Sequence, residues 1–61
     1  MEIKFKKFEP ATPVAKIKVS ELVQRGGRII EDRRDYVEIK REQSIAHIDQ
    51  YGRVEWRAEI D

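Results

Sequence analysis

The C-terminal stretch, residues 54–61, reads VEWRAEID and has the most regular apolar alternation in the chain. Val54, Trp56, Ala58 and Ile60 fall on one side of an extended backbone, and charged residues fall on the other. Because side chains alternate between the two faces of a strand, this spacing predicts a strand with one buried face. The stretch therefore indicates a β-containing fold and places Trp56 in its core.

Two further strands are predicted before this one, at residues 36–42 and 44–49, because apolar residues again recur at every second position. Their inward positions are Val37, Ile39, Ala46 and Ile48. Gly52 supplies the positive φ that a tight hairpin needs between the last two strands. These signals predict a three-stranded antiparallel meander, with residues 28–30 as a further short strand or as its lead-in.

The N-terminal segment alternates in the same way over residues 2–6, which predicts a strand over residues 3–8, and Pro10 and Pro13 then interrupt any ladder because proline lacks an amide donor. Residues 14–19 are rich in β-branched side chains, which favours a strand. We therefore expect these two segments to form a hairpin across the proline turn.

A helix is the other structure that fits residues 14–19. It would begin with Thr12 as N-cap and Pro13 at its first position, and Ile17 would then point away from its apolar side. The strand interpretation is preferred, with a short helix following it. Ser20 is a suitable N-cap for that helix, and Gly26 suits the left-handed position that closes it.

The order of these elements predicts an α+β or mostly β domain that covers residues 1–61. Its expected form is a small antiparallel sheet or partly open barrel, built from an N-terminal hairpin, one short helix and the C-terminal meander. The predicted core comprises Ile17, Val37, Ile39, Ile48, Val54 and Trp56. Phe8 and Tyr51 fall outside the alternation and are expected at the surface.

The composition bears on the stability and the location of this domain. Charged residues make up 41% of the 61 residues, well above the average of about 25%, although the net charge is only +1. There is no cysteine to reinforce so small a core, so stability has to come from packing or from a partner subunit. No apolar run approaches the length of a membrane span, and we expect a cytoplasmic protein without a membrane partner.

Basic residues are the most distinctive candidates for a binding site. In the predicted hairpin, four lysines project from one face, where like charges oppose one another and contribute nothing to stability. With two arginines near Gly26 they form a candidate site for an anion or a nucleic acid: Lys4, Lys6, Lys16, Lys18, Arg25 and Arg28. The alternative is an edge hairpin that its lysines keep from aggregating.

Catalytic signals are weak. His47 is the single histidine, and Asp49 is its only close companion on one strand face, which makes neither a hydrolytic triad nor a closed metal site. We therefore expect no catalytic, cofactor-binding or metal-binding residues and class the chain as a non-enzyme.

Two functions remain. The first is a small protein-interaction module that self-associates or docks on a protein partner, as the small core and the segregated charges suggest. The second is a nucleic-acid-binding domain that contacts phosphates through its basic hairpin, although a pI near 8.1 is low for that class. The interaction module is preferred.

Overall fold

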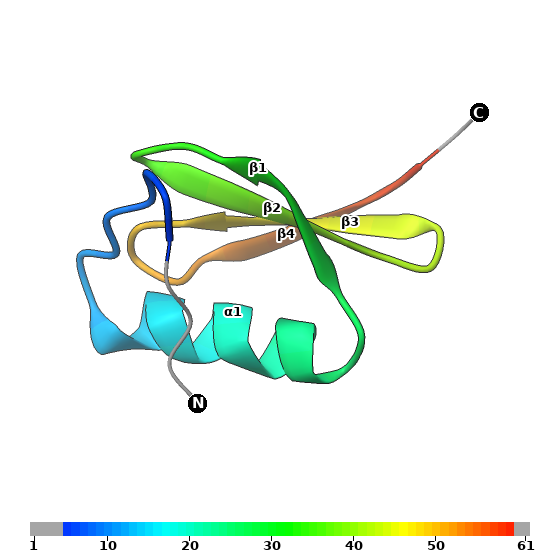
Figure 1. The fold of residues 1–61 in the computed structure, drawn as a ribbon, viewed down its shortest axis with the longest axis horizontal. Coiled ribbons are helices and arrows are strands. Elements are labelled where there is room, and N and C mark those ends of the chain that lie inside the picture. The colour runs from blue at the N-terminus through cyan, green and yellow to red at the C-terminus, as the bar shows by residue number, and fades with distance from the viewer. Residues whose placement is uncertain (1–4, 60–61) are drawn as a thin grey trace.

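In the computed structural model, which describes residues 5–59, one helix packs against one face of a four-stranded antiparallel sheet (Figure 1). The elements are α1 Pro13–Gln24, β1 Arg28–Asp32, β2 Tyr36–Arg41, β3 Ser44–Asp49 and β4 Val54–Ala58. The strands lie side by side in the order β1-β2-β3-β4. The expected α+β class is confirmed, and the sheet is open, so the barrel alternative is wrong. No helix among residues 5–59 is long and apolar enough to cross a membrane.

The predicted N-terminal hairpin is wrong, because residues 14–19 belong to α1. Thr12 has the extended backbone of an N-cap (φ −137°, ψ 156°) and Pro13 is the first helical residue. Burial at Ala15, Val19 and Leu22 follows the helical period, so packing of one apolar side outweighs the β-propensity of the segment. The helix starts well before Ser20, which therefore does not cap it.

Ile17 was expected in the core, but its side chain is 54% exposed on the outer side of α1. The helical alternative predicts this orientation, because a residue two positions from Ala15 and Val19 points away from them.

A Schellman motif ends α1. Gly26 has φ +97°, and its N–H donates to Val23 O at 3.0 Å, while the N–H of Gly27 donates to Leu22 O at 2.9 Å. The predicted left-handed closing role of Gly26 is confirmed.

The C-terminal meander has a fourth strand, because residues 28–32 form β1, so the alternative of a further short strand at residues 28–30 is confirmed with longer bounds. The register is regular in β2–β3 and β3–β4, and Gly52 has the expected positive φ of +88°. The apolar side of α1 covers the inward residues of the central strands, which are fully buried: Val37, Ile39, Ala46 and Ile48.

The segment that precedes α1 passes the end of β1 and the β1–β2 turn. Its main-chain N–H groups at Lys6, Lys7 and Phe8 donate to the Asp32 carboxylate at 2.8, 3.2 and 2.8 Å. Phe8 is 4% exposed and meets Phe5 edge to face, so the expectation of a surface position for Phe8 is wrong. Burial opposes ionisation of Asp32, but the main-chain donors outweigh it and lower the pKa of this carboxyl.

Candidate interaction surface at the β4 edge

Trp56 lies on the core face of the sheet without being part of the core. Its Cα partner is the buried Ala46, yet the Trp56 side chain is 52% exposed, which corrects its predicted burial. The prediction that Trp56 points to the core face is confirmed, but none of the described elements packs over its side chain. One helix is about 10 Å across and strands are spaced by about 4.8 Å, so α1 covers the central pair of strands and leaves an edge strand open.

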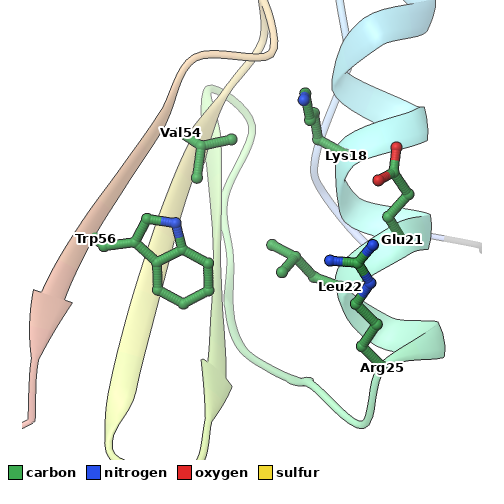
Figure 2. Close-up of a pocket in the computed structure, with 6 residues that line it drawn as sticks. All are labelled: Lys18, Glu21, Leu22, Arg25, Val54 and Trp56. Atoms are coloured by element: carbon green, nitrogen blue, oxygen red, sulfur yellow. The ribbon is translucent and has the colours of Figure 1, made fainter.

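A groove of about 200 Å³ separates α1 from β4. Figure 2 shows the side chains of Val54 and Trp56 projecting from the strand toward the helix, with Leu22 facing them. Charged side chains of α1 and of its C-cap residue complete the lining: Lys18, Glu21 and Arg25. The groove is thus lined by three apolar and three charged side chains.

The three charged residues share this wall because their spacing of three and four positions returns a side chain to the same helical face. Two cations and one anion alternate along it, so the wall offers partners to side chains of either charge.

The outer edge of β4 carries unpaired main-chain groups, because within residues 5–59 this strand pairs only with β3. The N–H of Asp49 donates to Arg53 O at 3.2 Å, and the N–H of Glu59 donates to Gln43 O at 2.8 Å. Because main-chain groups of an antiparallel strand alternate in direction, residues 53, 55, 57 and 59 face β3. Val54, Trp56 and Ala58 therefore direct their N–H and C=O groups outward.

The opposite edge of the sheet, β1, differs. Its register shifts between Ile29 and Glu31, which marks a β-bulge, and its last residue, Asp32, holds the N-terminal segment. A bulge, and a segment held at the end of the strand, hinder the addition of another strand. Of the two edges, β4 is the one with a regular, accessible ladder.

A polar cluster on the far face of the sheet holds β4 in place. Arg57 donates two hydrogen bonds to Glu38, at 2.7 and 2.9 Å, and so ties β4 to β2 across β3. His47 lies between them, with Nδ1 3.1 Å from Glu38 Oε2 and its ring 4.6 Å from that of Tyr36. The hydrogen bonds from Arg57, together with His47, outweigh burial and lower the pKa of Glu38 to about 2.

Among residues 5–59, the predicted cations do not form one surface. Lys4 lies outside the described residues, and Lys6 precedes α1 with its main-chain N–H on Asp32. A step of two residues in a helix turns a side chain by about 200°, so Lys16 and Lys18 lie on different sides of α1. The basic hairpin face is therefore wrong.

Two of the predicted residues do come together, since Lys18 and Arg25 line the groove. Arg28 begins β1, where it is exposed. Within residues 5–59, no group of three or more His, Asp or Glu side chains is placed to hold a metal ion.

The groove itself was missed from the sequence, although one signal pointed to it. The last strand of a meander is an edge strand unless the sheet closes. The inward side chains of residues 54–58 are therefore buried only if another element packs over them. Comparison of the chain with protein-family models, with curated proteins and with solved structures found no match.

Proposed function

We propose that this chain is a small non-catalytic protein-interaction module that binds an extended polypeptide segment along β4. The observation that carries the proposal is the position of Trp56. It presents an exposed indole above a groove and, on the same residue, outward-facing main-chain groups.

Strand addition fits this geometry because it uses both features at once. Main-chain hydrogen bonds to Val54, Trp56 and Ala58 would supply affinity, and every second side chain of the bound segment would enter the groove. Tryptophan is among the residues that most often dominate binding energy, since it buries a large area with few rotatable bonds. Bonds from Arg57 to Glu38 hold the strand in a fixed position, which reduces the entropic cost of binding.

The nucleic-acid alternative depended on four lysines on one hairpin, and α1 occupies the sequence of the second strand of that hairpin. Lys18 and Arg25 remain beside Trp56, but Glu21 lies between them on the same wall. This arrangement favours a polypeptide over a phosphate backbone.

The proposal is tested by selecting short displayed peptides, about five to seven residues long, on the immobilised protein. Selected peptides should bind the wild type and lose binding to Ala58→Pro, which removes an outward N–H and no bond to β3. Ala58→Ser keeps the N–H and is the matched control. Peptides that bind Ala58→Pro and Trp56→Ala as well as the wild type, or no selected peptides from a wild type that is monomeric, would overturn the proposal.

A further inference from the structure

The charges around β4 are self-complementary. Residues 53–59 read RVEWRAE, with alternating charges on the far face of the sheet at Arg53, Glu55, Arg57 and Glu59. At equal distances on the two sides of Trp56 the charges are opposite: Glu55 corresponds to Arg57, and Arg53 corresponds to Glu59. Within residues 5–59, Arg53 and Glu55 have no ion-pair partner, so both are available to another chain.

We propose that the segment completing the β4 edge is β4 of a second copy of this chain, paired antiparallel with Trp56 opposite Trp56. This inference rests on the proposed function and identifies the bound polypeptide as a second copy of the chain. The result is a symmetric dimer with one continuous eight-stranded sheet, since each copy contributes four strands.

Main-chain geometry restricts the register of this pairing. Outward-facing residues have to meet outward-facing residues, and one register that satisfies this condition pairs Trp56 with Trp56 and Val54 with Ala58. With Trp56 opposite its equivalent, Glu55 of each copy faces Arg57 of the other. Arg53 of each copy then faces Glu59 of the other, and each favourable pair occurs twice by symmetry.

The neighbouring registers bring like charges together. Pairing Val54 with Trp56 places Glu55 opposite Glu55, and pairing Trp56 with Ala58 places Arg57 opposite Arg57. Because like charges directly opposite each other destabilise a ladder, these registers are disfavoured. The order of charges therefore selects the register centred on Trp56.

The dimer also supplies the missing cover of Trp56. A two-fold axis perpendicular to the sheet keeps both helices on one face, so the two indoles lie beside each other between them. Arg57 uses two donors on Glu38 and has others left for Glu55 of the second copy. Both β4 edges are then paired and both outer edges are the bulged β1, so assembly stops at two chains.

Sedimentation velocity and the emission of Trp56, the only tryptophan, test the dimer over about a hundredfold range of concentration. The wild type and Ala58→Ser should shift from monomer to dimer as concentration rises, with a blue shift in emission as the indoles are covered. Ala58→Pro should stay monomeric and keep its red-shifted emission.

Charge reversal tests the register. Glu55→Arg and Arg57→Glu each place like charges opposite one another and should each weaken the homodimer roughly tenfold or more, because symmetry applies every change twice. A mixture of the two variants restores both pairs and should form a heterodimer. Glu9→Arg makes the same charge change on the segment that contacts the β1–β2 turn and is the matched control. Circular dichroism verifies that Arg57→Glu, which also loses the Glu38 pair, remains folded, and Glu55→Arg alone tests the register if it does not.

Three outcomes would overturn the inference: a wild type that stays monomeric throughout, a dimer that Ala58→Pro leaves intact, or a dimer that Glu55→Arg does not weaken. A monomeric wild type that still binds selected peptides in an Ala58→Pro-sensitive way would reject the second copy as partner and leave the interaction module standing. A wild-type protein that neither self-associates nor binds selected peptides would reject the two proposals together.

Discussion

Trp56 and Ala46 are direct neighbours in the β3–β4 ladder and point to the same face, yet Ala46 is 0% exposed and Trp56 is 52% exposed. The boundary of the area covered by α1 therefore runs between two adjacent strands. Burial on this face depends on distance from the helix and not on the polarity of the residue, so the largest side chain of the chain contributes less to the core than the smaller ones beneath α1.

Truncation of Trp56 should consequently cost little monomer stability. We expect Trp56→Ala to lower the free energy of unfolding by about 1–2 kcal/mol, because about half of its surface is already in water. Ile39→Ala, in the fully buried centre, should cost about 3–4 kcal/mol. Urea denaturation followed by circular dichroism at low protein concentration measures both, and an equal loss for the two variants would contradict the assignment of Trp56 to an open edge.

The Glu38 carboxylate should make stability depend on acidity. Its pKa falls from 4.5 to about 2 on folding, so its contribution is complete above pH 4.5 and is lost as the pH falls toward 2. One pKa unit corresponds to about 1.4 kcal/mol, and the half-exposed Arg57 reduces the gain, so Glu38→Gln should cost roughly 2 kcal/mol at pH 7.

Urea denaturation of the wild type and Glu38→Gln at several pH values checks this expectation. The difference between them should shrink steadily below pH 4.5. Glu59→Gln, which removes a more exposed pair with Lys40, is the control and should change stability by about 0.5 kcal/mol or less. A difference that is the same at pH 7 and near pH 2 would show that Glu38 acts through packing instead of charge.

Asp32 should govern the N-terminal segment. Its carboxylate accepts three main-chain N–H groups, of which that of Phe8 is partly buried, so Asp32→Ala removes three hydrogen bonds and should destabilise the protein by about 1–2 kcal/mol. Amide exchange at Phe8 should accelerate in the variant. Asp35→Ala, an exposed aspartate in the β1–β2 turn, is the control and should leave exchange at Phe8 unchanged.

The sequence predicted the C-terminal sheet well because its strands are regular and their partners are adjacent in the chain. Residues 44–49 were predicted with the observed bounds, and the inward phase at Val37, Ile39 and Ile48 is confirmed. Adjacent antiparallel strands need only short turns, so local patterns determine their pairing.

The preferred interpretation of residues 14–19 as a strand was wrong because their local propensity disagrees with their packing. Residues 14–19 contain β-branched side chains, but the apolar spacing of Ala15, Val19 and Leu22 suits a helix over the sheet. The preferred interpretation has only a short helix after residue 19, so it predicts neither the exposure of Trp56 nor the groove beside it. The candidate site lies between elements far apart in sequence, and its lining follows from how far α1 extends over the sheet.

The glycine pair after α1 offers a final test, because its members are required for different reasons. A Cβ at Gly26 would meet nothing within 4 Å, so the φ of +97° alone opposes a side chain, and Gly26→Ala should cost about 1 kcal/mol. A Cβ at Gly27 would lie 2.6 Å from Ile39 Cγ2 and 2.8 Å from the main-chain oxygen of Leu22. That oxygen accepts the hydrogen bond of the Schellman motif and cannot move freely, so Gly27→Ala should cost more, about 2–3 kcal/mol.

Asparagine at the same two positions separates the two reasons. Gly26→Asn should be more stable than Gly26→Ala because asparagine tolerates the left-handed region, whereas Gly27→Asn should not be more stable than Gly27→Ala. Urea denaturation ranks the four variants. A Gly27→Ala protein as stable as the wild type would contradict the close approach of Gly27 to Leu22 and Ile39.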